Sequence, residues 1–279
     1  MGEWVKRGNL FVFEGGEAGG KTTQISLVKT YLESLGFRVE SGREPGGVPS
    51  AERIRSCLLK PEEDPNFSYA REIEKVYSEL RSEVSAVTQA FLLGSLANQH
   101  LFEKEDPKHG KDLCRLSELG LYMGARRPFH EAVVAPALED PNCIFLSDRC
   151  GLSSRGYQGF GYDPTDHRFD EVIKRMNLLA TGGIEYNLAF ILDQEPKIGL
   201  AKTTTEEFGS KDRIERKPLE YHVNVRNGYL HMAKEDPERV KIVPYIKDDP
   251  RGMHKEIVKY IDQFIKDKEL KCQKSQQAA

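Results

Sequence analysis

The chain has 279 residues and a formal net charge of −3, enough length for a full hydrophobic core and too little positive charge for a nucleic-acid surface. No apolar run reaches the roughly 20 residues of a membrane span, and the first residues lack the apolar centre of a secretory signal. The five cysteines form no Cys-x-x-Cys pair, which favours free thiols in a reducing cytosol. We therefore expect a cytoplasmic protein that binds neither nucleic acid nor membrane.

The first motif is a glycine-rich loop between an expected strand and an expected helix. Residues 10–13 are an apolar run typical of a buried strand, and residues 21–35 show helical spacing of apolar positions. The loop between them fits G-x-x-x-x-G-K-[ST] without a mismatch. Its residues are Gly15, Gly16, Glu17, Ala18, Gly19, Gly20, Lys21 and Thr22, followed by Thr23.

This loop predicts a binding site for a nucleoside triphosphate. In such loops backbone N–H groups bind phosphate oxygens, a lysine such as Lys21 reaches the β- and γ-phosphates, and a hydroxyl such as that of Thr22 binds Mg²⁺. The following helix points its positive N-terminus at the same anion. A glycine-rich turn can match the pattern by chance, but the flanking strand and helix are the context that a phosphate loop requires.

Further strands and helices alternate along the chain. The expected strands are 38–41, 143–147, 188–192 and 240–245, and the expected helices are 51–59, 115–138, 165–180, 218–234 and one around 257–265. This alternation predicts an α/β fold with a five-stranded parallel sheet and helices on both faces. Ligands of such sheets bind beyond the carboxyl ends of the strands, where Arg43, Asp148, Arg149 and Asp193 fall together with the glycine-rich loop.

We expect one domain over residues 1–279, with three segments outside the regular alternation. Residues 61–118 form a helical insertion: 61–65 resemble a linker, 71–101 predict one long packed helix, and 103–111 form a charged loop. Residues 202–216 are polar and predict a lid, and residues 266–279 predict a polar tail.

Several segments together resemble the thymidylate kinases, in the family's order from residue 9 to about 265. They are the loop ending in Lys21-Thr22-Thr23-Gln24, Arg43-Glu44-Pro45-Gly46-Gly47, Ser147-Asp148-Arg149 with Ser153-Ser154 and Tyr157-Gln158-Gly159, Asp212-Arg213-Ile214-Glu215, and Arg226-Asn227-Gly228-Tyr229-Leu230. The resemblance implies a three-layer P-loop kinase fold, a homodimer, and transfer of the ATP γ-phosphate to dTMP with Mg²⁺.

The resemblance also implies roles for the charged residues. Lys21 and the loop amides hold the donor phosphates, and Thr22 and Asp148 hold Mg²⁺. Arg43 and Arg149 clamp the phosphate of the acceptor, because planar guanidinium groups suit phosphate oxygens. Arg213 is the best match for the cation that the family's lid supplies.

Recognition of the base is assigned by resemblance to a helix that carries an aromatic residue one turn before an arginine. Tyr122 and Arg126 have this spacing, so Tyr122 lies against the pyrimidine and Arg126 donates to its O4. Ser153 and Ser154 reach the polar edge of the base. The sugar is bounded by Tyr157 near C2′ and by Glu17, which accepts from the 3′-hydroxyl.

Two points stay open at this level. Residues 88–100 also resemble the base-reading helix, but Gly94 and Asn98 stand where the aromatic residue and the arginine are expected, so we assign Tyr122 and Arg126. The acceptor is dTMP or another pyrimidine, such as dUMP, a modified nucleotide or a nucleoside. A third reading is a P-loop binding module without kinase activity.

Overall fold

The structure, a computed structural model, describes residues 7–59, 68–105, 113–203 and 212–270. Four predicted features therefore lie largely outside the described residues: the linker 61–65, the charged loop 103–111, the central part of the lid and the end of the polar tail. Of the cysteines, Cys57, Cys114, Cys143 and Cys150 are described, and all four are free thiols as predicted.

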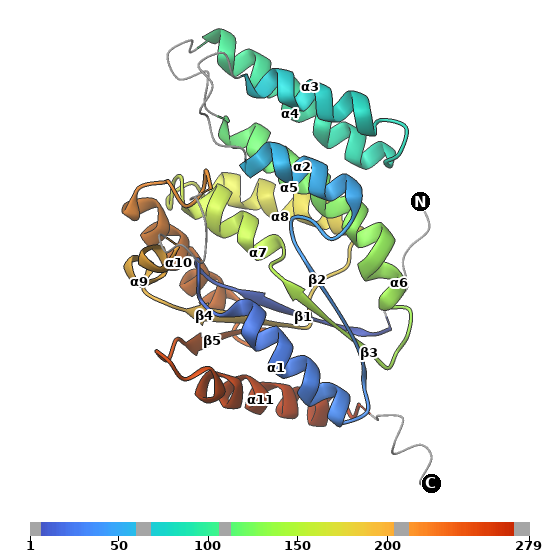
Figure 1. Cartoon of the computed structure of the whole chain (residues 1–279), viewed down its shortest axis with the longest axis vertical. Helices are drawn as coiled ribbons and strands as arrows, with labels where there is room; N and C mark the ends of the chain where they lie inside the picture. The colour runs from blue at the N-terminus through green and yellow to red at the C-terminus, as the bar shows by residue number, and fades with distance from the viewer. Residues whose placement is uncertain (1–6, 60–67, 106–112, 204–211, 271–279) are drawn as a thin grey trace.

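Five parallel strands form one sheet in the order β2-β3-β1-β4-β5, which confirms the predicted architecture (Figure 1). The strands are β1 (Asn9–Glu14), β2 (Arg38–Arg43), β3 (Cys143–Asp148), β4 (Leu188–Asp193) and β5 (Val240–Pro244). In the register, Asp148 lies beside Phe13 on one side and beside Arg43 on the other. The phosphate loop and the two arginine-bearing ends of β2 and β3 therefore meet at one edge of the sheet.

The alternation of side chains along β1 builds a core on each face of the sheet. Phe11 and Phe13 pack with the helices α1 (Lys21–Ser34) and α11 (Pro250–Asp267). Leu10 and Val12 pack on the other face with residues of α10 (Leu219–Glu235) and of the helix that begins at Arg115. Both faces of β1 are buried, as the uninterrupted apolar run predicts for a central parallel strand. In the described part of the chain, no helix is both long and apolar enough to cross a membrane.

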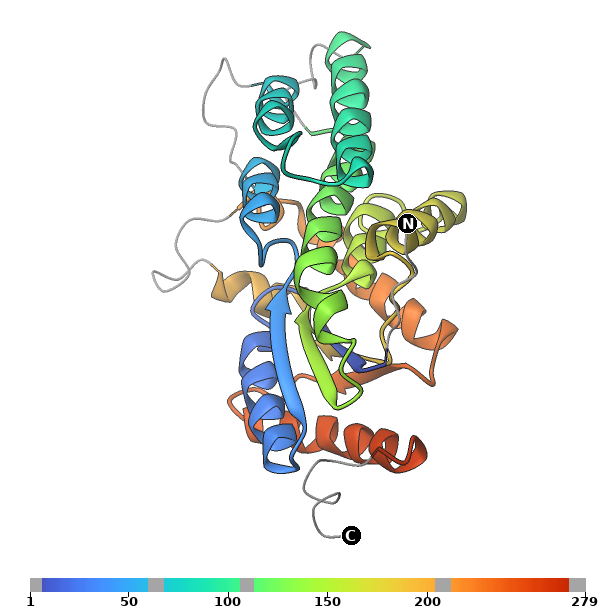
Figure 2. The ribbon, with the colours of Figure 1, turned by 90° about the vertical axis from the view of Figure 1, so that its right-hand side faces the viewer.

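The prediction of one long helix over 71–101 is wrong, because the chain folds there into a helical hairpin. Helix α3 (Tyr69–Leu80) and helix α4 (Ala86–Glu105) pack against each other and stand above α2 (Pro49–Leu59) (Figure 2). Ser85 breaks the helical run, and its hydroxyl lies 3.4 Å from that of Thr88. A straight helix of this length would extend about 46 Å and leave its apolar stripe in water, whereas the hairpin buries it.

The helix predicted over 115–138 is confirmed, but one segment inside it is π-helical and not α-helical. Helix α5 (Arg115–Phe129) continues through a π-helical segment (His130–Val134) into α6 (Ala135–Ala137). Pro136 has no N–H to donate, which disfavours a regular α-helical turn before it. A second π-helical segment (Arg155–Phe160) follows α7 (Gly151–Ser154) directly after β3. The remaining helices are α8 (His167–Thr181) and α9 (Pro196–Lys202).

Candidate active site

The phosphate loop has the strand-loop-helix geometry that its sequence predicts. Gly15 has a φ of +129°, and a Cβ there would lie 2.5 Å from the carbonyl oxygen of Leu192 on β4. Lys21 begins α1, and its ammonium group donates to the carbonyl oxygens of Gly16 at 2.9 Å and Gly15 at 3.3 Å. Burial and the nearby Arg149 lower the pKa of Lys21, while Glu17 and Asp148 oppose that shift. The loop therefore holds its lysine folded over its own backbone.

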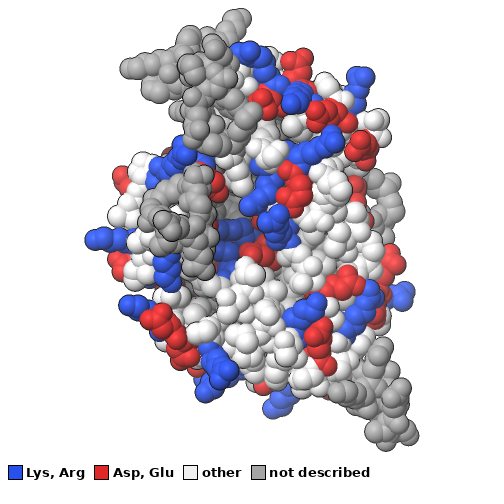
Figure 3. Space-filling model, viewed as in Figure 1, with Lys and Arg blue, Asp and Glu red and all other residues white. Residues whose placement is uncertain are grey.

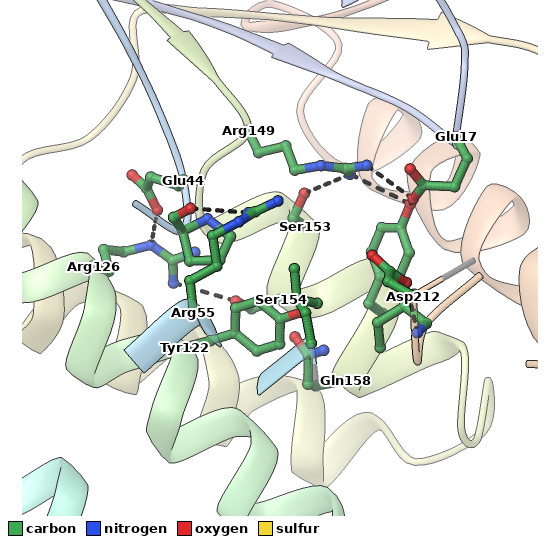
Figure 4. Close-up of a pocket in the computed structure, with 14 residues that line it drawn as sticks. Glu17, Glu44, Arg55, Tyr122, Arg126, Arg149, Ser153, Ser154, Gln158 and Asp212 are labelled. Carbon is green, nitrogen blue, oxygen red and sulfur yellow. Dashed lines mark hydrogen bonds and ion pairs between the residues drawn. The ribbon is translucent and has the colours of Figure 1, made fainter. Parts of the chain in front are cut away.

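A cavity opens beside this loop, and it gathers most of the predicted acceptor site (Figure 4). Figure 3, viewed from the same direction as Figure 1, shows Lys and Arg side chains around a hollow near the middle of the molecule. The predicted residues that line the cavity are Glu17, Tyr122, Arg126, Arg149, Ser153, Ser154 and Tyr157. They come from the phosphate loop, α5 and the segment after β3, which lie far apart in the sequence.

Arg149 connects the phosphate loop to the acceptor side of this cavity. Its guanidinium group lies 3.0 Å from the Glu17 carboxylate and donates to the Gly15 carbonyl, the Ser153 hydroxyl and the Tyr157 hydroxyl at 3.2–3.3 Å. Its backbone φ is +74°, in the left-handed region that a residue other than glycine adopts at a cost of about 1 kcal/mol or more. The strained turn places a positive charge next to the loop that binds phosphate.

Glu17 is held as a carboxylate by these neighbours. Burial disfavours its charge, but Arg149, Lys21 and the Tyr157 hydroxyl at 2.6 Å outweigh burial and lower the pKa of Glu17 to about 2. An ionised Glu17 can accept a hydrogen bond from a sugar hydroxyl, as the sequence predicts.

The Glu17 carboxylate should make the stability of the protein depend on pH. Its pKa in the folded state, about 2, lies below the unfolded value of 4.5, so its contribution is complete above pH 4.5 and is lost as the pH falls towards 2. A shift of this size corresponds to up to about 3 kcal/mol. We expect the difference in unfolding free energy between the parent and Glu17→Gln, measured in urea, to shrink steadily over that window. A difference that stays constant between those two pH values would contradict the assignment.

Tyr122 and Arg126 lie four residues apart on α5 and both line the cavity, which supports choosing this helix over residues 88–100. On α4, Gly94 is exposed and Asn98 donates to the Gly94 carbonyl at 2.7 Å, so neither is among the residues that line the cavity. The first segment instead serves as packing: α4 lies along α5.

Glu44 positions Arg126, a role that was not predicted from the sequence. Its buried carboxylate accepts from Arg126 Nε and lies 3.0 Å from His130 Nε2. Arg126 also donates to the Ser154 hydroxyl at 3.2 Å and to Asn177 Oδ1 at 2.6 Å. Burial opposes the charge of Glu44, but Arg126 and His130 outweigh burial and lower its pKa. The guanidinium group is thus fixed before any ligand binds.

Removing Glu44 should cost about 3–5 kcal/mol of unfolding free energy, because Arg126 would stay buried without its counter-charge. Guanidinium denaturation of Glu44→Ala measures this loss. The matched control is Glu52→Ala, which breaks an exposed pair with Arg43 at 2.9 Å and should cost about 1 kcal/mol or less. Equal losses in the two variants would contradict the buried role of Glu44.

Arg43 is not brought into the cavity, and Arg55 is. The Arg43 side chain is exposed and pairs with Glu52, although its backbone lies beside Asp148 at the end of the sheet. Arg55, on α2, lines the cavity and donates to the Pro45 carbonyl at 3.0 Å (Figure 4). Arg55 was not predicted as a site residue. Its position on the helix after the Arg43 loop could have suggested it, but Arg53 lies on the same helix, and only the packing of the helix shows that Arg55 is the one that lines the cavity.

Arg213 also lies outside the lining of this cavity. Its guanidinium group is 2.9 Å from the fully buried Glu118 carboxylate of α5 and donates to the Leu58 carbonyl at 3.0 Å. Its neighbours Asp212 and Ile214 do line the cavity. Arg213 therefore ties the last part of the predicted lid to α5, and its role as a lid cation stays a prediction.

A second buried carboxylate, Glu14, fixes the segment that follows β3. It accepts from the backbone N–H of Cys150 at 2.8 Å and of Ser153 at 3.0 Å, and from the hydroxyls of Ser153 at 2.6 Å and Tyr229 at 2.8 Å. Glu14 was not predicted as a site residue, although a single carboxylate at the end of an apolar strand could have suggested such a role. Glu14 orients Ser153 toward Arg149 and the cavity.

Comparisons with known proteins agree with this geometry. The family model described as thymidylate kinase matches residues 13–106 and 92–257. A thymidylate kinase of Symbiobacterium thermophilum is 32% identical over 232 residues, covering 83% of this chain and 82% of the relative. Another from Sulfurihydrogenibium sp. is 31% identical over 256 residues, covering 92% and 98%.

The solved structures include a thymidylate kinase from Ehrlichia chaffeensis with the same fold. It has a TM-score of 0.58 and 21% identity, and the match covers 91% of this chain and 98% of that chain. The family model and the two relatives cover most of the chain, and the residues that the family model matches include the phosphate loop and the segment after β3. This chain therefore belongs to the thymidylate kinase family.

Proposed function

We propose that this protein transfers the γ-phosphoryl group of ATP to dTMP. A phosphate oxygen of dTMP attacks the γ-phosphorus, the bond to the β,γ-bridging oxygen breaks, and dTDP and ADP are formed. The observation that carries this proposal is the cavity in which Tyr122 and Arg126 meet Arg149 and Glu17 beside the phosphate loop. In this proposal the Tyr122 ring stacks on the base, Arg126 donates to it, and Arg149 binds the acceptor phosphate beside the ATP site.

The acceptor phosphate is bound, in this proposal, between the phosphate loop and the arginines near it. Arg149 is in place, and Arg55 reaches the same cavity from α2. Arg43 stays a candidate for this clamp, since the end of β2 lies beside Asp148. Because phosphoryl transfer depends mostly on positioning and charge neutralisation, several fixed cations are what the reaction requires.

ATP and Mg²⁺ are assigned to the loop and to the end of β3. Backbone amides of residues 15–23 and Lys21 bind the triphosphate, and a hydroxyl and a carboxylate, Thr22 and Asp148, are hard oxygen donors of the kind Mg²⁺ takes. The described residues contain no cluster of three or more His, Cys, Asp or Glu, which suits an ion held mainly by phosphate and water. Bound Mg²⁺ would neutralise charge on the transferring phosphoryl group.

A coupled assay with a panel of monophosphates tests the acceptor. The panel contains dTMP, dUMP, dCMP and UMP with ATP and Mg²⁺, and thymidine as the unphosphorylated control. We expect the highest kcat/KM with dTMP. A preference for dUMP, dCMP, UMP or thymidine would move the proposal to that acceptor, and no turnover with any of them would favour a binding module.

We also predict a homodimer, and the helical hairpin offers a surface for it. The side chains of Leu93 and Leu101 on α4 are 45% and 53% exposed in the single chain. Sedimentation velocity should show a dimer at micromolar concentration, and Leu93→Glu should shift it towards monomer by roughly tenfold or more in Kd, since burying an unpaired charge is costly. A monomeric parent protein would contradict the prediction.

A further inference from the structure

A fully buried carboxylate on α5, that of Glu118, lies beside the acceptor cavity and has no part in the proposed reaction. Its side chain is 0% exposed, and it stands one helical turn before Tyr122, which lines the cavity. Glu118 is not itself among the residues that line the cavity. A buried charge needs partners, and those of Glu118 come from two other parts of the chain.

The first partners of Glu118 belong to the segment that follows α7. Gln158 Nε2 donates to Glu118 at 2.7 Å, and the Tyr162 hydroxyl donates to it at 2.8 Å. Gln158 lines the acceptor cavity (Figure 4). Because a carboxylate only accepts, Glu118 fixes which end of the Gln158 amide faces it. Arg115 donates to the backbone carbonyls of Gln158 and Gly159 at 2.6 Å and 3.1 Å, so the backbone there is held independently of Glu118.

The other partner of Glu118 is Arg213, which also contacts α2. Its Nη2 lies 2.9 Å from the Glu118 carboxylate as an ion pair without hydrogen-bond geometry, and its Nε donates to the Leu58 carbonyl at 3.0 Å. Leu58 lies in the last turn of α2, where carbonyl groups have no partner within the helix. One turn earlier, α2 carries Arg55, which lines the cavity. Arg213 thus joins α2 to α5.

Arg213 stands between two residues that line the acceptor cavity, Asp212 and Ile214. The Asp212 carboxylate closes a turn here, because its Oδ1 accepts from the backbone N–H groups of Ile214 at 2.8 Å and of Glu215 at 2.9 Å. In such a closed turn the placement of Arg213 also sets the placement of its two neighbours. The contact with Glu118 therefore holds this part of the cavity wall against α5.

The cluster around Glu118 is explained by geometry and not by stability. A buried ion pair is often no more stabilising than apolar residues of the same volume. A buried carboxylate with three polar partners does, however, impose one relative placement on the elements that carry them. Those elements are α5, the end of α2, the turn at 212–215 and the segment after α7, and each of them supplies residues to the acceptor cavity.

We propose that Glu118 is a positioning residue for the acceptor nucleotide. It holds Gln158 directly. Through Arg213 it holds Asp212 and Ile214 at the edge of the cavity. Without Glu118 these parts of the wall lose their fixed spacing and the acceptor binds more weakly, whereas the phosphate loop keeps its own contacts. The effect on the acceptor rests on the proposed function, but the positioning itself does not.

The test removes both charges of the buried pair at once. Glu118→Gln alone would leave Arg213 buried without its counter-charge, and loss of the fold would obscure the result. The double variant Glu118→Gln with Arg213→Met removes both charges. Its matched control is Glu220→Gln with Arg216→Met, which removes the same two kinds of group from residues that are exposed. Thermal unfolding should show that both double variants are folded at the assay temperature.

Steady-state kinetics with ATP and dTMP separates a positioning role from a purely structural one. In the Glu118/Arg213 variant we expect the KM of dTMP to rise about tenfold, the size of effect expected when one positioned hydrogen-bonding group is lost. The KM of ATP should stay within about twofold and kcat within about fivefold, because loss of folded protein alone would lower apparent kcat and leave both KM values unchanged. The control should match the parent. An unchanged KM of dTMP would overturn the proposal, and a loss of about a hundredfold or more in kcat with that KM unchanged would instead give Arg213 a role at the transferring phosphoryl group.

Hydrogen exchange followed by mass spectrometry tests the positioning without any nucleotide. Peptides that cover residues 212–217 and the end of α2 should exchange about tenfold faster or more in the Glu118/Arg213 variant, because local opening becomes easier, and at the parental rate in the control. Parental rates in both variants would overturn the proposal whatever the acceptor is. A parent protein that does not phosphorylate dTMP would count against the proposed function instead, and the kinetic comparison would then be made with the acceptor that the panel identifies.

Discussion

Replacing Lys21 by alanine should lower kcat by several orders of magnitude while the protein stays folded. The ammonium group of Lys21 starts α1 and lies 2.9 Å from the Gly16 carbonyl in the phosphate loop. Charge on the transferring phosphoryl group is stabilised mainly by such fixed cations, and even a single neutral donor to a developing charge is worth about 10²–10³ in rate. Steady-state kinetics with saturating ATP and dTMP measures the loss.

A matched control is available on the same helix. Lys29 is about 41% exposed and makes a weak contact with Glu33 at 4.0 Å, so Lys29→Ala should change neither kcat nor the melting temperature appreciably. Circular dichroism of Lys21→Ala should show an intact fold, because the Lys21 ammonium group donates its hydrogen bonds to the carbonyl oxygens of Gly15 and Gly16 in the loop and does not hold other elements together. Turnover within tenfold of the parent enzyme would refute the role of the phosphate loop.

The acceptor cavity should rank pyrimidine nucleotides in the order dTMP, dUMP, dCMP. Loss of the 5-methyl group costs roughly 1 kcal/mol of apolar burial, which corresponds to a loss of about five- to tenfold. Cytosine presents an amino group to Arg126 where thymine presents a carbonyl oxygen. Two donors then face each other in a closed site, and each unsatisfied group costs about 1–3 kcal/mol, so kcat/KM for dCMP should be at least about a hundredfold lower.

The variant that tests this discrimination has to respect the Glu44 pair. Arg126→Ala alone leaves a buried carboxylate without its cation, so loss of stability would obscure the result. The double variant Arg126→Met with Glu44→Gln removes both charges and should reduce the preference for thymine over cytosine to about tenfold or less while the KM of ATP stays near that of the parent. Urea unfolding of the double variant is the control and should show that it stays folded under the assay conditions, because no buried charge is left unpaired. Equal kcat/KM for dCMP and dTMP with the unaltered protein would show that Arg126 does not read the base.

Local patterns in the sequence were enough for the phosphate loop and for the sheet. The pattern from Gly15 to Thr22 is contiguous, and its function depends on backbone N–H groups and one lysine that the chain itself brings together. Strand positions followed from apolar runs such as residues 143–147. A central parallel strand is buried on both faces, so nearly all its residues are apolar and the run can be found in the sequence alone. Tyr122 and Arg126 were assigned through the resemblance to the thymidylate kinases, and the structure places both in the lining of one cavity.

Tertiary structure alone decided which other side chains enter the site. Arg55 and Arg43 are equivalent in sequence as arginines near one loop, yet the packing of α2 points Arg55 into the cavity and leaves Arg43 in an exposed pair with Glu52. Arg213 matched a lid motif, but the buried Glu118, which lies 95 positions earlier in the chain, holds it against α5.

The sequence by itself determined the family, the phosphate loop and the parallel sheet whose strand ends meet at one edge. These features depend on periodicity and on residues that are neighbours along the chain. Only the tertiary structure decided the hairpin over 69–105 and the Glu44–Arg126–His130 cluster. The hairpin forms because two short helices bury an apolar stripe that one long helix would expose. The cluster forms because the buried charge of Glu44 needs partners, and the fold supplies them from residues more than 80 positions away.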